Sequence, residues 1–489
     1  MTPNRKSRNT AVVLGSALAL LICYPAGAAE RTDAFARPIS FTTAYENLSL
    51  PGERRMGMLG LGLNQELNRH FSAGVQAWSA VRGDHGGFIT IGFDGAGRTP
   101  LADGLGLEGG LFIGAGGGHG ENALSGGGLM LRTYAQLTLD AGAWGRIGAG
   151  ISRVAFPSGS IRTTQPMASY TLPLASAAGD RGSSTHVPGK RQVSIVGANV
   201  KVGSSVRNTR ATMQEEFRLV GITFDNFVND DWYLRLEAAG GAGGHSAGYM
   251  QVLAGPGLRV PLYDCIYLDT SVGIGGAGGG AVDTGGGLLY KASAGLQLFL
   301  TRQLFAEASV GYLTSSEGSF KAVTPSLQFG SRFGGGMSSD GDSPLPLRVR
   351  MASEHYFKAS DNWRTQYVDQ GVDNLGLQLD YFFSPSVYMT GQALAAYAGK
   401  AGAFMIGLFG AGVQQDIAPR FFLQGEGLLG VAGGGGIAVG SGAVWQGNAS
   451  LGYRLSREFS IMATGGRIGA FDGDFKAKVM GLALSYGNR

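Results

Sequence analysis

The stretch Ala277-Gly-Gly-Gly280, followed closely by Gly285-Gly-Gly287, decides the fold because the chain repeats it. A second copy starts at Ala432, 155 residues further on, and the same spacing holds without a gap over a long span. The segment Phe320-Lys321-Ala322, for example, recurs as Phe475-Lys476-Ala477. Matching Phe and Lys residues cannot be explained by the 85 glycines of the chain, so the spacing indicates homologous units.

A third, looser copy lies around Gly126-Gly-Gly128. In every copy another glycine follows at a spacing of 31 residues: Gly159 after Gly128, Gly318 after Gly287 and Gly473 after Gly442. The repeats predict three homologous units joined by linkers rich in Ser, Gly, Pro and Asp. We place the units at 29–171, 191–330 and 345–489, and the linkers, on the periplasmic side, at 172–190 and 331–344.

The N-terminus has the three parts of a secretory signal peptide, which we place at 1–28. A basic region around Arg5 precedes the apolar run 11–22, which is too short to span a bilayer, and Ala26-Gly-Ala28 supplies a small-residue cleavage site. Removal of this segment leaves Cys265 as the only cysteine and excludes an internal disulfide. We expect Cys265 to be a small, inward-facing, buried residue and not a reactive thiol.

The composition excludes several classes of protein. Only 15% of the residues are charged, the mean hydropathy is +0.06 and aromatic residues make up 10%, so the chain is not a disordered secreted protein. No uncharged apolar run reaches about 18 residues, which excludes a helical membrane protein. A formal charge of +4 is small for 489 residues and indicates no nucleic-acid partner.

Two-residue periodicity predicts eight strands in each unit, because successive side chains of a strand face opposite ways. In the middle unit, Leu268 and Val272 share one face while Asp269 lies on the other. In the last unit, Trp445 and Leu451 alternate with Gln446 in the same way. The predicted strands of the middle unit are 191–202, 212–227, 231–240, 247–260, 264–275, 286–300, 303–313 and 318–330.

An apolar face opposed by a small and polar face, with short turns alternating with longer loops, resembles the Gram-negative outer-membrane β-barrels as a class. The last strand, with Met480, Leu482 and Tyr486 on one face, resembles their assembly signal, although Gly487-Asn488-Arg489 follows the aromatic residue. The resemblance implies location in the cell outer membrane. It also implies lipid as a partner and recognition of the last strand by the barrel-assembly machinery.

The fold class expected is all-β, a transmembrane antiparallel barrel of about 24 strands made from three eight-stranded repeats. Such a wide barrel would leave a lumen that side chains cannot fill. The alternative is three separate eight-stranded barrels strung on the linkers, each with an interior filled by side chains.

Candidate lumen residues are the ionisable or amide side chains expected on inward faces. We expect neighbouring acids and bases to form ion pairs inside the barrel or to line a solute path. The candidates are Glu108, Arg132, Asp269, Lys291, Glu307, Glu426 and Gln446.

Histidines and glycines of the outer loops are the other candidates. His85, His119 and His245 fall in predicted outer loops, where a hydrolase could use them, but solvated loop histidines are the simpler interpretation. The Gly-rich loops lack the Gly-Lys-Ser/Thr of a phosphate-binding loop. They are interpreted as sharp turns and close strand approaches, or as a constriction folded into the lumen.

The function expected is a passive outer-membrane channel, or an export or uptake pore, for an unidentified solute or polymer. We expect no enzyme activity, cofactor or bound metal, and a periplasmic or secreted-polymer partner stays open. The alternatives are a structural or adhesive surface protein, and an outer-membrane hydrolase that uses the loop histidines.

Overall fold

The computed structural model describes residues 39–118, 122–174, 191–203, 216–244, 246–333 and 347–487. The predicted signal peptide at 1–28 and most of both predicted linkers lie outside these residues. Within them the chain is almost entirely antiparallel β-structure, with one short helix, α2 (Asn122–Ser125), and one 3₁₀ turn, η1 (Gly142–Trp144). The prediction of an all-β fold is confirmed.

The strands fall into three consecutive groups of eight, each of which we call a barrel. Barrel 1 consists of β1 (Ile39–Leu48), β2 (Met56–Glu66), β3 (Phe71–Arg82), β4 (Ile89–Ala102), β5 (Leu105–Gly117), β6 (Met130–Asp140), β7 (Arg146–Ala155) and β8 (Arg162–Leu174). Barrel 2 consists of β9 (Arg191–Val202), β10 (Glu216–Phe227), β11 (Trp232–Gly243), β12 (Met250–Tyr263), β13 (Ile266–Gly278), β14 (Leu288–Phe299), β15 (Leu304–Ser315) and β16 (Lys321–Phe333). Barrel 3 consists of β17 (Leu347–Lys358), β18 (Val372–Phe382), β19 (Val387–Ala398), β20 (Met405–Asp416), β21 (Phe421–Gly433), β22 (Ala443–Arg454), β23 (Phe459–Ala470) and β24 (Lys476–Tyr486).

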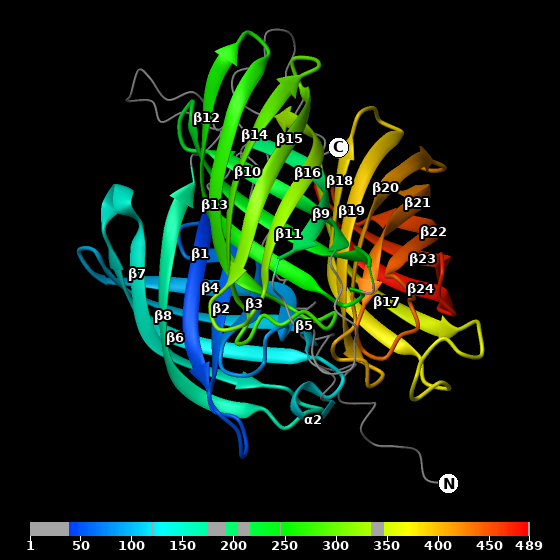
Figure 1. Cartoon of the computed structure of the whole chain (residues 1–489), viewed down its shortest axis with the longest axis horizontal. Coiled ribbons are helices and arrows are strands. Elements are labelled where there is room, and N and C mark those ends of the chain that lie inside the picture. The colour runs from blue at the N-terminus through cyan, green and yellow to red at the C-terminus, as the bar shows by residue number, and fades with distance from the viewer. Residues whose placement is uncertain are drawn as a thin grey trace.

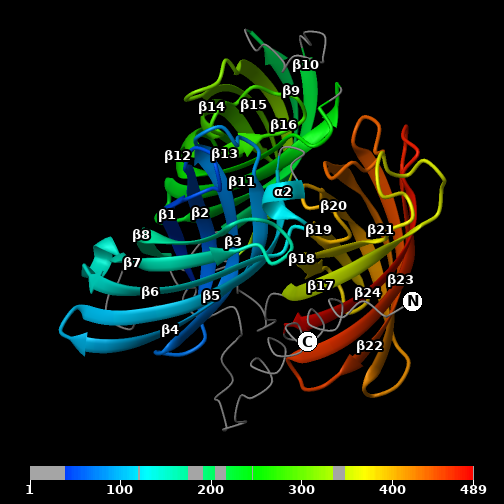
Figure 2. The ribbon, with the colours of Figure 1, turned by 90° about the horizontal axis from the view of Figure 1, so that it is seen from below.

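Each barrel closes on itself: β1 pairs with β8, β9 with β16, and β17 with β24. The preferred prediction of one barrel of about 24 strands is therefore wrong, and the alternative of three eight-stranded barrels is confirmed. Figures 1 and 2 show the three closed sheets, blue to cyan, green, and yellow to red. An even number of strands lets the first and last strand of each unit pair antiparallel, so no edge is left over.

Apolar side chains on the outer faces of all three barrels are exposed. Leu327 in β16 is 62% exposed and Leu482 in β24 is 71% exposed, and similar residues occur around every barrel. A soluble protein rarely leaves so large an apolar surface uncovered, whereas a barrel in a bilayer presents such a face to lipid. Among the described residues, no helical segment has the length and apolar character needed to cross a membrane.

Cys265 departs from its prediction. It lies in the two-residue turn between β12 and β13 and is exposed, not buried and inward-facing. The predicted strand starts at residue 264, two residues before the observed start of β13. The prediction therefore assigns Cys265 to the inner face of a strand, although it lies in the turn.

The barrels meet around a common centre, with the third strand of each barrel lying against the fifth strand of another (Figure 1). β3 lies against β13, β11 against β21, and β19 against β5. This cyclic pattern is the closed, head-to-tail contact of a three-fold ring, made here by three parts of one chain. We call the contacts between barrels 1 and 2, 2 and 3, and 3 and 1 the three seams.

Glycines of the repeated stretches form the seams. A Cβ atom on Gly86 of barrel 1 would lie 2.3 Å from the carbonyl oxygen of Gly285 of barrel 2, and the Gly86 amide donates a hydrogen bond to that oxygen at 3.0 Å. A Cβ on Gly402 of barrel 3 would lie 2.8 Å from the carbonyl oxygen of Gly126 of barrel 1. The repeated glycines therefore allow backbones of different barrels to approach closely.

The third seam differs because Ala247 of barrel 2 occupies the position that corresponds to Gly86 and Gly402. Its Cα lies 3.5 Å from the Cβ that Gly442 of barrel 3 would carry. Near the other two seams, apolar outer residues from two barrels are buried in joint clusters. Leu61 of barrel 1 is 9% exposed, whereas its counterpart in barrel 2, Ile222, is 40% exposed, so the seam between barrels 2 and 3 is the more open one.

We predict that Gly86→Val separates barrel 1 from barrel 2, because its side chain would overlap the backbone of Gly285. The measurement uses full-length protein in detergent with protease sites inserted in both linkers. After cleavage, we expect barrels 1 and 2 to copurify from the parent protein and barrel 1 to be largely released from the variant. Gly465→Val is the control, because a Cβ on this glycine of β23 meets nothing within 4 Å. Equal retention in both variants would contradict the role of the glycine.

Candidate functional site

Inward-facing side chains fill each barrel in two layers. The layer at the loop end is an apolar cap, which contains Phe88 and Phe156 in barrel 1, Tyr249 and Phe320 in barrel 2, and Tyr356, Trp363, Phe404 and Phe475 in barrel 3. Phe88, Tyr249 and Phe404 occupy corresponding positions, directly before the fourth strand of each barrel. The layer nearer the short turns is polar and charged, and it contains most of the predicted lumen residues.

In barrel 1, the buried Arg132 of β6 spans the lumen to Glu46 of β1, with Nε 3.1 Å from Oε2. The guanidinium also lies 4.4 Å from the ring centre of Trp78. Ser152 donates a hydrogen bond to the same carboxylate, and Gln165 donates to Ser152 at 2.9 Å. A charge pair with this many hydrogen bonds is tolerated in the interior, and it narrows the lumen at this level.

In barrel 2, two arginines and two aspartates form one ion-pair network. Arg235 donates to both oxygens of Asp225 at 2.8 Å, and Arg259 donates to Asp269 at 2.7 Å. The Asp269 carboxylate also accepts a hydrogen bond from Tyr233 at 2.6 Å. Two further acids complete the layer: Glu237 pairs with Lys291 at 2.5 Å, and Glu307 accepts from Gln328 at 2.9 Å.

In barrel 3, Arg350 bridges two carboxylates. It pairs with Asp380 at 2.5 Å and with Glu426, which also accepts from Tyr388 at 2.8 Å. Arg348 pairs with Asp380 at 2.6 Å. Gln446 donates to Glu354 at 3.1 Å and thus contacts the first strand of its barrel, as Arg132 does in barrel 1.

All seven predicted lumen residues lie on inner faces, but the acids and bases do not pair with one another as expected. In the strand register, Glu108 stands opposite Gln136, four residues from Arg132. Glu108 accepts a hydrogen bond from Gln136 at 2.8 Å instead. The predicted ion pairs join neighbouring strands, whereas some of the observed ion pairs join strands on opposite sides of the lumen.

Most of the charged lumen residues were missed, and the inner faces are richer in charge than expected. The missed residues are Glu46, Asp94, Asp225, Arg235, Glu237, Arg259, Arg348, Arg350, Glu354 and Asp380. The two-residue periodicity could have identified them as inward-facing residues. In β17, for example, Arg348 and Arg350 alternate with Val349 and Met351.

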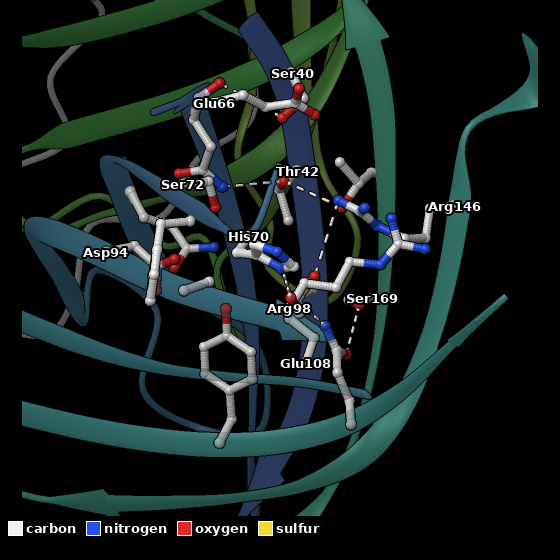
Figure 3. A pocket seen from close by; sticks show the side chains of 18 of the residues that line it. Ser40, Thr42, Glu66, His70, Ser72, Asp94, Arg98, Glu108, Arg146 and Ser169 are labelled. Carbon is white, nitrogen blue, oxygen red and sulfur yellow. Dashed lines mark hydrogen bonds and ion pairs between the residues drawn. The ribbon is translucent and has the colours of Figure 1, made fainter. Parts of the chain in front are cut away.

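Barrel 1 contains a polar cavity of about 80 Å³ below its ion pair, near the short turns (Figure 3). Side chains from separate strands face this space, among them Thr42 of β1, Asp94 of β4, Glu108 of β5 and Ser169 of β8. His70, Arg98 and Arg146 lie toward the short turns. A void at the same general level of barrel 2, beside Arg235, measures only about 10 Å³.

The strand register explains why the cavity of barrel 1 is larger than the void of barrel 2. Asp94 of barrel 1 stands opposite Gly74, whereas the corresponding positions of barrel 2 hold Gly255 opposite Arg235. The Arg235 side chain extends into the lumen and pairs with Asp225, whereas Gly74 has no side chain to do so. Barrel 3 has Thr390 opposite Gly410 there, and Arg350 fills the interior from β17.

The structure describes only one of the three candidate histidines. His85 is buried, and its Nε2 lies 2.8 Å from Oε2 of Glu53, so it is not a solvated loop residue. His119 and His245 lie outside the described residues. The described part of the chain contains no group of three or more His, Cys, Asp or Glu side chains placed to hold a metal ion.

No family model matches the sequence, and no curated protein is significantly similar to it. Among solved structures, Ail, the attachment invasion locus protein of Yersinia pestis, is 20% identical over 30% of this chain and 99% of its own, with a TM-score of 0.22. The ferric enterobactin receptor PfeA of Pseudomonas aeruginosa is 10% identical over 93% and 82%, with a TM-score of 0.29. OpdQ of the same species is 10% identical over 92% and 96%, with a TM-score of 0.22.

We predict that Arg350→Met destabilises the protein by about 3–5 kcal/mol, because Glu426 would lose its buried cation. Arg454→Met is the control, since its pair with Asp416 is partly exposed, and we expect it to cost less than about 1 kcal/mol. The free energy of unfolding in urea, followed in detergent micelles or liposomes, gives both values. Equal losses in the two variants would contradict a structural role for the barrel 3 network.

A second prediction concerns pH and the loop between β13 and β14, which helps to cap barrel 2. Burial would raise the pKa of Asp283 in this loop, but hydrogen bonds from Ser319 and the Gly285 amide outweigh burial and hold the pKa below its ordinary value. A depressed pKa stabilises the folded loop above the ordinary pKa of Asp, about 4, and the stabilisation is lost as the pH falls through the folded-state value. Hydrogen exchange of residues 279–287 should therefore quicken at acid pH, relative to intrinsic rates. In Ser319→Ala the loss should start at a higher pH; an unchanged profile would contradict this account.

Proposed function

We propose that this chain is an integral protein of the outer membrane that provides a narrow, normally closed route for small polar solutes through barrel 1. The observation that carries the proposal is the polar cavity of about 80 Å³ in that barrel, which opens toward the short turns and ends below an apolar cap. The apolar outer faces support location in a membrane, and the predicted signal peptide supports export. The apolar last strand supports assembly through the barrel-assembly machinery, with outer-membrane lipid around the barrels.

The route is narrow because each lumen belongs to an eight-stranded barrel, whose interior side chains can fill. In barrel 1, the Arg132–Glu46 pair and the cap around Trp78 lie above the cavity. Passage of a folded or extended polymer would require removal of both layers, so the solutes proposed are small. Buried apolar rings at a constriction exclude water and act as a gate.

Barrels 2 and 3 support a second role, that of a structural surface protein. Their ion-pair networks fill the level at which barrel 1 is hollow, and the loops that carry Trp363 and Phe320 fold over their lumens. We propose that these two barrels stabilise the assembly and present its loops at the cell surface. A catalytic role for the loop histidines is not proposed, because His85 is buried against Glu53.

Conductance in planar bilayers tests the route, with cap variants matched between barrels. Phe88 and Phe156 of barrel 1 pack edge to face with ring centres 5.5 Å apart, while Tyr249 and Phe320 of barrel 2 lie 6.1 Å apart. We expect small, infrequent openings from the parent protein. The double change Phe88→Ala with Phe156→Ala should raise the mean current by roughly threefold or more, because it removes the apolar constriction.

The double change Tyr249→Ala with Phe320→Ala is the control and should leave the current close to that of the parent, since the network of barrel 2 still fills its lumen. Large steady openings in the parent would contradict the closed cap. If the current rises equally in both double variants, the route cannot be assigned to barrel 1. The same holds if the current rises in neither variant.

A further inference from the structure

The cavity of barrel 1 contains a buried carboxylate that forms no ion pair with an arginine or lysine of the described residues. Asp94 of β4 lines the cavity and is 6% exposed, and its Oδ1 accepts no hydrogen bond. The hydroxyl of Tyr134 lies within reach of this carboxylate. An ionised carboxylate in such a place needs a compensating charge or hydrogen-bond donors.

Three of the four arginines that line the cavity form ion pairs with acids other than Asp94. Arg132 pairs with Glu46 at 3.1 Å, Arg146 lies 3.8 Å from Glu108, and Arg98 lies 3.6 Å from Asp140. Arg69 and Glu66, of opposite charge, are exposed at the mouth. The inner end of the cavity is therefore left with the negative charge of Asp94.

The remaining lining groups are oxygen-rich and suit a hard cation. Asn64 is also buried, and its Oδ1 lacks a hydrogen-bond partner. Ser40, Thr42 and Ser169 add hydroxyl oxygens to the lining. Hard cations prefer carboxylate, carbonyl, hydroxyl and water oxygens, and a volume of about 80 Å³ has room for roughly six water positions.

We infer that the cavity of barrel 1 is a binding site for a small, partly hydrated monovalent cation such as sodium or potassium, held by Asp94 and the oxygen of Asn64. This inference rests on the proposed route and names its solute class, because a cation site in the lumen makes the route cation-selective. The site has no counterpart in the other barrels, where Gly255 and Gly410 stand in place of Asp94.

Cation-dependent stability tests the site without requiring conduction. The melting temperature of the detergent-solubilised full chain is compared in potassium chloride and in N-methylglucamine chloride of equal concentration. We expect potassium to raise the melting temperature by about 2–4 °C, as a ligand that binds only the folded state does. Asp94→Asn keeps the size and the Tyr134 contact and should abolish the difference. Asp103→Asn, an exposed acid in the turn between β4 and β5, should preserve it.

Reversal potentials in a potassium chloride gradient give the second measurement. The parent should prefer potassium over chloride, and Asp94→Asn should lose that preference by roughly tenfold while still conducting. If the parent protein shows no conductance but potassium still raises its melting temperature, the proposed route is wrong and the proposed cation site is supported. An Asp94→Asn variant that keeps the melting difference, or a parent that shows none, would overturn the site whatever the conductance.

Discussion

Close approach of backbones at the glycines of the three seams is the constraint on which the arrangement of this protein depends. Apolar surface alone cannot hold two barrels together in lipid, because the lipid is equally apolar, so packing and backbone contact must supply the association. Gly86 and Gly402 meet glycines of the next barrel at distances that leave no room for a side chain. The repeated triplets are thus explained by contact between units, in addition to turns within them.

The three seams are not identical. At the seam between barrels 2 and 3, Ala247 replaces the glycine and Ile222 remains exposed, although Gly433 still lies close to the backbone of Gly248. Barrel 1 takes part in both of the seams that have a joint apolar cluster, and it is also the barrel with the hollow lumen. The lumen of barrel 1 differs from the other two because it has Asp94 where the corresponding position of each other barrel is a glycine.

Much of the fold was predictable from the sequence, because two-residue periodicity and repeat spacing are local signals. The eight strands of the middle unit were predicted within a few residues, and the alternation around Asp269 and Gln446 placed these side chains on inner faces as observed. The way in which the sheets close was not predictable from the sequence. A strand such as β8 has the same alternating pattern whether it pairs with β1 or with β9. The ion pairs that cross the lumen, such as Arg132 with Glu46, depend on that closure, so the sequence alone could not predict them.

Closure can be measured directly with cysteine pairs in protein that carries Cys265→Ser. Thr42 of β1 and Thr171 of β8 face each other in barrel 1, with their hydroxyl oxygens 3.3 Å apart. In a single 24-stranded barrel, β1 would instead pair with β24. The account predicts that Thr42→Cys with Thr171→Cys forms a disulfide in the membrane-inserted protein, and that Thr43→Cys with Leu482→Cys, between β1 and β24, does not. The opposite pair of results would contradict three separate barrels.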